Sequence, residues 1–335
     1  MQVHNLWIPC VMELLQLELD DWANTDEKYR SLCMACIRNL SRAFNVLPPL
    51  FLVNIQREHP HPIRGGGFAD IWKGKIGDQA ICLKVLRTYL ESDELTRKKV
   101  ESDFCNEALL WRQLRHPNVL PFFGVNTTLF GFCLVSPWMS NGDIVTRSVI
   151  MEIADGLNYL HSLKPPVVHG DVCGANILMN HDGHCCLADF GLAIASLIHT
   201  GEQAKKPLSR DQRPRDVYAF ACTVVEILSC NVPFSEKPTD IAVMFAIVNG
   251  LRPGRPEAVW CPDDIKLCWS QKPGDRVSAN YIWSTLLNEV ANGTIESDTH
   301  QHLTRETSSH AWRKCRREGG RLKGFSKVFV QQRCR

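Results

Sequence analysis

From about residue 68 onward, the spacing of apolar residues changes from mainly strand-like to mainly helical, and this change restricts the fold more than any other feature. Two strand-like runs, FADIWKGKI and QAICLKVLR, are separated by Gly77-Asp78, a pair typical of hairpin turns. A helix is expected over about 92–114, and two more strand-like runs follow it, NVLPFFGV and GFCLVSPWM. Helical spacing then dominates, over residues 147–162, 216–230, 238–249, 262–269 and 279–290. We therefore predict an α+β chain with a β-rich first lobe and an α-rich second lobe.

Residues 1–58 precede this pattern and contain a helical period of their own. Between residues 25 and 44 apolar side chains recur with helical spacing, acidic residues occupy the first turn, and Asn24 or Thr25 is the expected N-cap. The helix is expected to end before Pro48-Pro49. We predict that residues 1–58 form a helical extension whose amphipathic helix packs on the rest of the chain, with binding to a separate partner as the alternative.

Positive charge is concentrated near the C-terminus. The whole sequence has a net charge of +2, whereas residues 298–335 contain ten Lys and Arg against three Asp and Glu. Trp312, Phe325, Val328 and Phe329 lie among these charges, a composition that could contact nucleic acid or anionic lipid. A solvated face is the more common state of a charge run. We therefore expect residues 298–335 to be a basic, disordered tail without a nucleic-acid partner.

Fifteen cysteines raise the question of disulfides. No signal-peptide pattern precedes them, and many lie in apolar runs such as CCLADF and FACTVVEILSC, where reduced and buried thiols are expected. No uncharged apolar stretch reaches the roughly 18 residues that span a bilayer. We expect a cytoplasmic protein without a membrane span, with the nucleus as the alternative location.

Two charged residues fall inside apolar segments of the first lobe. Glu107 shares a helix face with Phe104 and Trp111, and Lys84 lies in the middle of the apolar strand AICLKVL. A buried charge without a partner is costly, so each is expected to neutralise the other. Either residue alone would more often be an exposed or snorkelling side chain. Together they predict a positioned ion pair that can hold phosphate.

The run RGGGFADIW places glycines between two expected strands. Without side chains, backbone N–H groups of such a loop can approach phosphate oxygens. A plain flexible turn explains the run equally well when it is considered alone.

Hard oxygen ligands are clustered in the second lobe. VVHGDVCGANILM presents Asp171 and Asn176 five positions apart on a loop between two short strands. The turn NHDGH then returns the chain, which places Asp189 of LADFGLA beside Asn176. Carboxylate and amide oxygens with bound phosphates make a site that magnesium accepts.

From about Pro62 to Leu287 the sequence resembles the eukaryotic protein kinase family. GGGFADIWKG looks like the glycine-rich loop, ICLK contains the phosphate-holding lysine, HGDVCGAN is similar to the catalytic loop, and Asp189-Phe190-Gly191 looks like the metal-binding triplet. The texture of EALLWRQLRHPNVLPFFGV is most similar to the tyrosine-kinase-like (TKL) group of filamentous, basidiomycete-type fungi. The resemblance implies a two-lobe kinase domain over 62–290, with the first lobe at about 62–139 and the second at about 140–290.

The resemblance also implies roles for individual residues. Asp171 would orient the acceptor hydroxyl and take its proton, Lys84 with Glu107 would hold ATP phosphates, and Asn176 and Asp189 would bind Mg²⁺. The residues implied in ATP binding are Gly65, Gly66, Gly67, Ile71, Cys82, Lys84, Ser136 and Met139. The implied activity is that of a transferase that moves the γ-phosphate of ATP to a hydroxyl of a protein substrate in intracellular signalling. A serine/threonine preference rests on the group resemblance alone.

Several positions depart from the family pattern. Gly170 stands where many kinases have an arginine that binds a phosphorylated activation loop, and Cys173 stands where serine/threonine kinases have a lysine near the γ-phosphate. Only 27 positions separate Asp189 from Asp216, and no Ala-Pro-Glu triplet ends that shortened activation segment, so Arg276 lacks its usual partner. The chain is also short after Gly142-Asp143-Ile144. A gene-model error and a degenerate kinase both explain such gaps.

These departures leave three functions in competition. The leading one is ATP-dependent protein phosphorylation with poor docking of peptide substrates. The second is a pseudokinase, a nucleotide-binding interaction module with little or no transfer activity. The third is phosphotransfer to small molecules, because His-Gly-Asp followed by Asn also resembles aminoglycoside and choline kinases.

Overall fold

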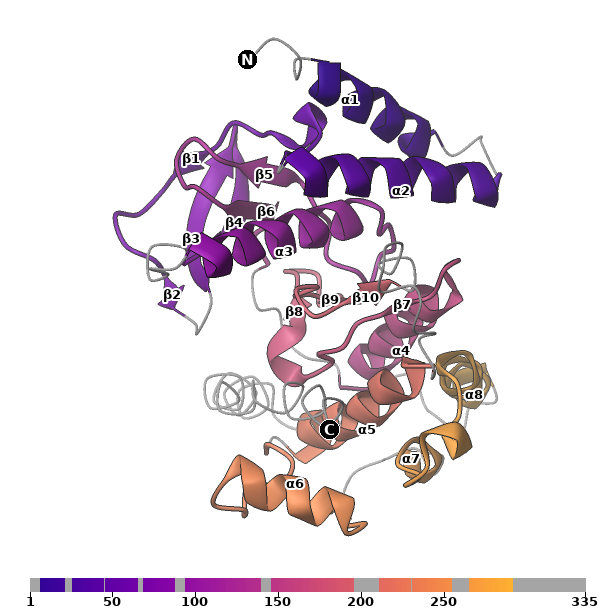
Figure 1. The fold of residues 1–335 in the computed structure, drawn as a ribbon. Coiled ribbons are helices and arrows are strands. Elements are labelled where there is room, and N and C mark those ends of the chain that lie inside the picture. The colour runs from indigo at the N-terminus through magenta and orange to yellow at the C-terminus, as the bar shows by residue number, and fades with distance from the viewer. Residues whose placement is uncertain are drawn as a thin grey trace. The chain divides into compact units, whose positions relative to one another are not determined.

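A computed structural model describes residues 7–21, 26–44, 46–65, 69–87, 94–139, 146–195, 211–229, 231–254 and 265–291 (Figure 1). The predicted tail, residues 298–335, lies outside this set, as do residues 140–145 and 196–210 within the two segments that the sequence predicts to be shortened. The chain divides into two compact units, and each is described by itself. The first is rich in strands and the second in helices, so the predicted α+β architecture is confirmed.

A six-stranded sheet forms the centre of the first unit, which includes the described residues up to His116 and the segment Leu120–Met139. Its main path runs β1-β3-β4-β6-β5, with β2 pairing to β3, and the pairs are antiparallel. The strands are β1 (Gln56–Arg57), β2 (Arg64–Gly65), β3 (Ala69–Ile76), β4 (Gln79–Leu86), β5 (Gly124–Asn126) and β6 (Cys133–Pro137).

Strand alternation gives this sheet one apolar face. Ile81, Leu83 and Val85 of β4 point to a core that also contains Ile55, Cys133 and Val135. The intervening residues of β4, including Cys82 and Lys84, point to the opposite face because successive side chains in a strand alternate. The sequence pattern therefore predicts both the hairpin and the facing of its side chains.

The run NVLPFFGV forms much less strand than its apolar composition suggests. Only Gly124 and Val125 of this run join β5, and residues 120–123 have no ladder partner. Pro121 contributes to this difference, because proline has no N–H group to donate to a neighbouring strand.

Helices cover the remaining parts of the first unit. They are α1 (Trp7–Asp20), α2 (Glu27–Phe44), the 3₁₀ turn η1 (Pro49–Phe51) and α3 (Glu94–Arg112). α1 and α2 pack on each other, α2 packs on α3, and α1 also contacts η1. The expected cap of α2 at Asn24 or Thr25 is wrong, because the Asp26 carboxylate accepts the N–H groups of Lys28 and Tyr29, at 2.9 and 3.1 Å.

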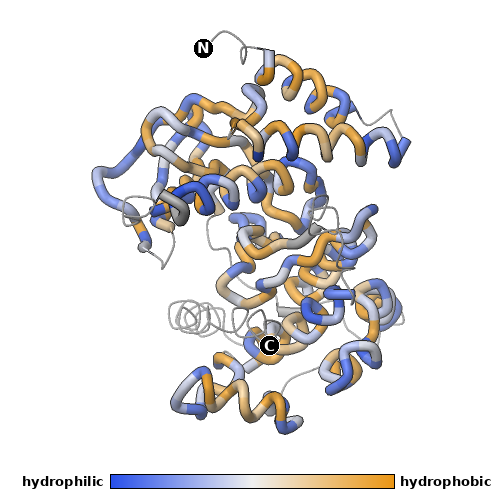
Figure 2. Tube along the Cα trace, viewed as in Figure 1, coloured by the Kyte–Doolittle hydropathy of each residue, from blue (hydrophilic) through white to orange (hydrophobic). Residues whose placement is uncertain are grey.

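The second unit is built around α5 (Arg213–Ser229), most of which is buried. α4 (Thr146–Ser162) packs on α5 and on α8 (Ala279–Ala291). The other helical elements are η2 (Gly174–Asn176), α6 (Asp240–Val248), α7 (Ile265–Cys268) and η5 (Pro273–Asp275), and apolar residues dominate α6 (Figure 2). Short strands form two pairs, β7 (Val167–Val168) with β10 (Ile194–Ala195) and β8 (Ile177–Met179) with β9 (Cys185–Leu187).

Among the described residues, no helix is both long enough and apolar enough to cross a lipid bilayer.

Candidate active site

One face of the first unit's sheet collects the residues predicted to bind nucleotide. Ile71 of β3 lies opposite Lys84 of β4, and Cys82 of β4 lies opposite Ser136 of β6. Directly opposed residues of an antiparallel pair point to the same face, so these four side chains share the face that is turned away from the apolar core. Met139 lies two residues beyond the end of β6.

Lys84 forms the ion pair that the sequence predicts. Its Nζ lies 2.9 Å from Oε1 of Glu107, and the two side chains are 19% and 7% exposed. α3 carries Glu107 to this position, while Phe104 and Trp111 of the same helix are buried. An ammonium group is therefore held in a fixed place on the sheet face, with a carboxylate behind it.

Cys82 is a neutral neighbour of this pair. Burial raises the pKa of its thiol to about 11, although a hydrogen bond with Ser136 and the charge of Lys84 act in the opposite direction. The thiol therefore contributes packing and no charge to this face near neutral pH.

The glycine run is described only in part. Gly65 belongs to β2, where it lies opposite Asp70, and the Ile63 N–H donates to the carbonyl of Ile71 at 2.8 Å. Gly66 and Gly67 lie outside the described residues. Their predicted contact with phosphate stays a prediction.

In the second unit, a 3₁₀ turn folds the loop between β7 and β8 back on itself. The Asn176 N–H donates to the carbonyl of Cys173 at 3.0 Å, which closes η2. The side-chain amide of Asn176 then donates to the Asp171 carbonyl at 2.8 Å and to its carboxylate Oδ2 at 3.0 Å. The two residues that the sequence places five positions apart are thus directly bonded.

The β8–β9 hairpin returns the chain to Asn176. Ile177 lies opposite Leu187, and the Ala188 N–H donates to the carbonyl of Asn176 at 2.9 Å. The next residue, Asp189, has a φ of +70°, which is uncommon for a residue with a side chain. Such backbone conformations persist where surrounding structure enforces them, and they cluster at functional sites.

Asp216, in the first turn of α5, holds the backbone of the loop that carries Asp171. Its Oδ2 accepts the His169 N–H at 2.7 Å and lies 2.9 Å from Nε2 of His161, while Oδ1 accepts the Gly170 N–H at 2.8 Å. Burial by itself would raise the pKa of this carboxyl, but these hydrogen bonds and the nearby imidazoles lower it overall. Sequence reasoning missed the roles of Asp216 and His161, and the available signal was a carboxylate that directly precedes the apolar run VYAFA.

Gly170 is required where it stands. Its φ is +81°, and an added Cβ would lie 2.7 Å from the carbonyl oxygen of Leu192. An arginine at this position would collide with that backbone. The sequence interpretation, that phosphate on an activation loop is not bound here by an arginine, agrees with this geometry.

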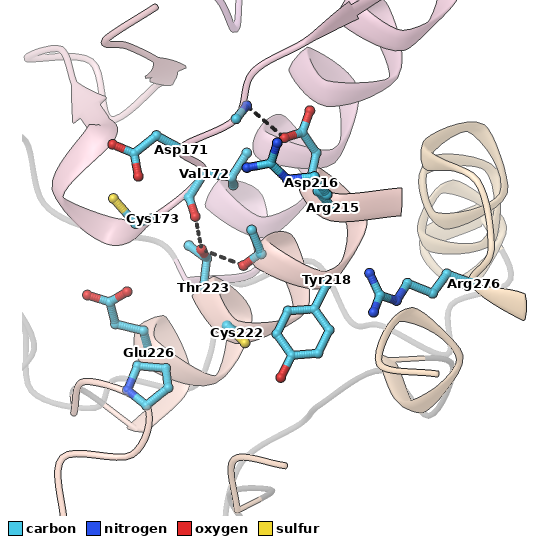
Figure 3. Close-up of a pocket in the computed structure, with 13 residues that line it drawn as sticks. Asp171, Val172, Cys173, Arg215, Asp216, Tyr218, Cys222, Thr223, Glu226 and Arg276 are labelled. Carbon is cyan, nitrogen blue, oxygen red and sulfur yellow. Dashed lines mark hydrogen bonds between the residues drawn. The ribbon is translucent and has the colours of Figure 1, made fainter. Parts of the chain in front are cut away.

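A cavity of about 100 Å³ lies beside the loop that carries Asp171. Figure 3 shows Asp171, Cys173 and Glu226 on one side of it and Arg215 and Arg276 on the other, with Tyr218 and Thr223 of α5 between them. Burial is the largest cause that raises the pKa of the Cys173 thiol, and the charges of Asp171 and Glu226 add to it. Cys173 is therefore neutral and cannot supply the positive charge of a lysine.

Arg276 has partners in place of the absent glutamate. Its guanidinium donates to the carbonyls of Ser270 and Pro214, both at 2.9 Å, and lies 4.9 Å from the centre of the Tyr218 ring. Backbone oxygens and an aromatic face thus offset this half-buried charge.

The predicted magnesium ligands suit the ion in their chemistry. The side-chain N–H₂ of Asn176 donates to Asp171, so its amide oxygen, the atom that a hard cation would bind, points away from Asp171. In the described part of the chain, no group of three or more His, Cys, Asp or Glu is placed to hold a metal. Asn176 and Asp189 would therefore need phosphate oxygens of a nucleotide as further ligands.

Comparison with known proteins finds similarity to protein kinases. Residues 58–215 match the family model described as protein tyrosine and serine/threonine kinase. The chain is 28% identical over 269 residues to the probable serine/threonine-protein kinase roco7 of Dictyostelium discoideum, a match that covers 66% of this chain and 10% of that protein. It is 26% identical over 265 residues to the serine/threonine-protein kinase STY17 of Arabidopsis thaliana, covering 70% of this chain and 45% of the relative.

A human protein is similar to the same extent. The serine/threonine-protein kinase TNNI3K of Homo sapiens is 26% identical over 239 residues, covering 62% of this chain and 28% of that protein. The chain thus spans less than half the length of each of these three relatives. Since they come from several kingdoms, the resemblance to fungal kinases in particular stays a prediction.

Proposed function

We propose, from the protein kinase domain that this chain contains, that it transfers the γ-phosphate of ATP to a serine or threonine hydroxyl of a protein substrate. The similarity to STY17 and TNNI3K, which are serine/threonine-protein kinases, and to roco7, a probable one, supports the serine/threonine preference. Phosphorylation of a protein would place the chain in intracellular signalling.

The Lys84–Glu107 ion pair is the observation that carries this proposal. The Lys84 ammonium lies 2.9 Å from the Glu107 carboxylate and suits the phosphates of a nucleotide. The same sheet face carries Ile71, Cys82 and Ser136, against which the base of that nucleotide would lie. Glu107 fixes the lysine, so that binding a phosphate does not require the side chain to be ordered first.

Asp171 would act on the acceptor hydroxyl. The hydrogen bonds from Asn176 fix its carboxylate, and Asp216 fixes the preceding backbone, so Oδ1 or Oδ2 can accept the proton as the oxygen attacks phosphorus. When bound with the nucleotide, Mg²⁺ would neutralise negative charge on the phosphates, and Asn176 and Asp189 are the residues that would hold it.

A second candidate function is favoured by Cys173. A neutral thiol occupies the position where a lysine would stabilise the γ-phosphate, which reduces the electrostatic help available to transfer. The chain would then be a pseudokinase that binds nucleotide and acts through its interactions.

Autophosphorylation with radiolabelled ATP separates these functions. We expect incorporation by the full chain, loss of incorporation in Asp171→Asn, and unchanged incorporation in Asp182→Asn, whose carboxylate lies in the exposed β8–β9 turn. Stabilisation by Mg-ATP in a thermal-shift measurement reports nucleotide binding independently. Stabilisation without incorporation would support the pseudokinase, and the absence of both would refute nucleotide chemistry altogether.

A further inference from the structure

The N-terminal helix α1 is bonded directly to the C-terminal end of α3. The Asp20 carboxylate accepts Nη2 of Arg112 at 2.6 Å and Nη2 of Arg115 at 3.0 Å, across more than ninety residues of sequence. One turn earlier in α1, the buried Gln16 accepts a hydrogen bond from Gln113 at 3.3 Å and donates to Asp20 at 3.1 Å. Three side chains thus bond to the Asp20 carboxylate, and Gln113 bonds to one of them, Gln16.

The surroundings of Arg112 strengthen this contact. Its guanidinium lies 5.9 Å from the centre of the buried Phe51 ring, and Phe51 belongs to η1, which packs on α1. The side chains of Arg112 and Asp20 are only 27% and 21% exposed. Partial burial screens the pair less than full exposure would, so it is stronger than a typical surface ion pair.

The same helix carries Glu107. Arg112 follows Glu107 by five residues, or about 7.5 Å along the axis of an α-helix. Between them, Trp111 is buried and donates from Nε1 to the Leu120 carbonyl at 2.6 Å. A hydrogen-bonded helix transmits a displacement of its end over such a short span, so the position of Glu107 depends on what holds Arg112.

We propose that Asp20 is a positioning residue for nucleotide binding, acting through Arg112, α3 and Glu107 on Lys84. The inference rests on the proposed function, because it takes Lys84 to be the residue that holds ATP phosphates. Asp20 keeps α3 where Glu107 reaches Lys84, and loss of its charge lets α3 shift away from the sheet. The N-terminal extension thereby sets the affinity of the chain for nucleotide without contacting it.

The first test is the affinity of the full chain for a fluorescent ATP analogue with Mg²⁺. We expect Asp20→Asn to weaken binding by about threefold to fivefold, the size expected when a partly exposed charge pair is lost. Asp20→Glu should bind within about twofold of wild type, because it keeps the charge. Glu18→Gln is the matched control, since Glu18 is an exposed carboxylate on the same helix.

A double mutant separates positioning from general stability. In a Glu107→Gln background the route from Asp20 to Lys84 is already cut, so Asp20→Asn should weaken binding no further. Hydrogen exchange supplies a readout without nucleotide, and Asp20→Asn should speed exchange of α3 amides more than Glu18→Gln does. Arg115→Gln removes only the more exposed half of the contact and serves if Asp20→Asn does not fold.

The possible outcomes separate failure of this inference from failure of the proposed function. Unchanged affinity in Asp20→Asn, or an equal further loss in the Glu107→Gln background, overturns the inference while leaving the proposed function intact. If the wild-type chain binds no nucleotide, the proposed function fails, and the inference fails with it.

Discussion

The side-chain amide of Asn176 donates to both the backbone carbonyl and the carboxylate of Asp171, at 2.8 and 3.0 Å. This bifurcated contact fixes the direction of the carboxylate while the amide oxygen remains available to a cation. One residue thus links the proposed base to the proposed metal site.

Replacing Asn176 with Ala should remove both effects. We expect the rate of phosphate incorporation to fall by about a hundredfold or more, the lower end of what a positioned proton acceptor contributes. The Mg²⁺ concentration needed for half-maximal rate should also rise. Asn231→Ala is the matched control, because Asn231 is exposed and bonds to the neighbouring Ser229. A rate within threefold of wild type would contradict the assigned role.

Breaking the Lys84–Glu107 pair from one side should cost stability. Glu107→Gln removes the carboxylate charge that lies 2.9 Å from a largely buried ammonium, and the free energy of unfolding should fall by about 3 kcal/mol. The double variant Lys84→Met with Glu107→Leu should recover most of this loss, since apolar residues of similar size often replace buried pairs without penalty. Denaturant unfolding measures both changes.

The affinity of these variants for nucleotide should not follow the order of their free energies of unfolding. The double variant should bind Mg-ATP as poorly as Glu107→Gln or worse, because it has no ammonium at all. Lys237→Met is the control, because it removes a partly exposed lysine of the second unit. Recovery of nucleotide binding in the double variant would show that Lys84 does not hold phosphate.

Asp216 should make the stability of the second unit dependent on acid pH. Its pKa is lowered in the folded protein, so its contribution is fully present above the unfolded value of about 3.9 and is lost as pH falls through the lower folded value. We expect the free energy of unfolding to fall as pH drops below about 4, and Asp216→Asn to flatten this dependence. Asp240→Asn, at the exposed start of α6, should leave it unchanged.

His184 should affect stability at higher pH, where the free energy of unfolding falls as pH rises. A hydrogen bond that the imidazole donates to the Glu152 carboxylate raises the pKa of this imidazole. Its contribution is therefore complete below the unfolded value of about 6.5 and is lost as pH rises through the folded value. Thermal unfolding of His184→Gln should lose the part of the pH dependence between about 6 and 8 that wild type shows, whereas His181→Gln should retain it.

Cys173→Lys tests whether the missing charge limits transfer. The adjacent cavity of about 100 Å³ offers room for a longer side chain, and Asp171 and Glu226 supply neighbouring negative charge. We expect the rate of phosphate incorporation to rise by about tenfold, with little change in nucleotide affinity. Cys222→Lys, placed elsewhere on the same cavity wall, should not raise it.

The parts of the site that sequence reasoning predicted are local in the chain or carry a strong pattern. The β8–β9 hairpin that returns Asp189 is encoded by two apolar runs and a turn, and Lys84 is conspicuous because it interrupts an apolar strand. Its partner Glu107 follows from the need to neutralise a buried charge.

The parts that were missed are polar contacts between distant segments. Asp216 lies 47 residues from the His169 N–H that it accepts, and Asp20 lies 92 residues from Arg112. Hydrophobic periodicity carries no information about which distant polar groups meet. The helix α1 itself was not separated from α2, because the sequence reading assigned a helical period only from residue 25.

The strand β1 changes what counts as the folding unit. The sequence predicts a helical extension over residues 1–58. At its end Gln56 and Arg57 pair with β3, and a Cβ at Gly74 would lie 2.5 Å from the Gln56 carbonyl oxygen. Glycine at position 74 therefore allows β1 to approach β3 closely, although the family match begins only at residue 58. The region that matches the family model thus begins at residue 58, whereas the region expected to unfold as one unit also includes Gln56 and Arg57. A chain shortened to the inherited boundary would expose an unpaired sheet edge, and such edges recruit other strands into aggregates.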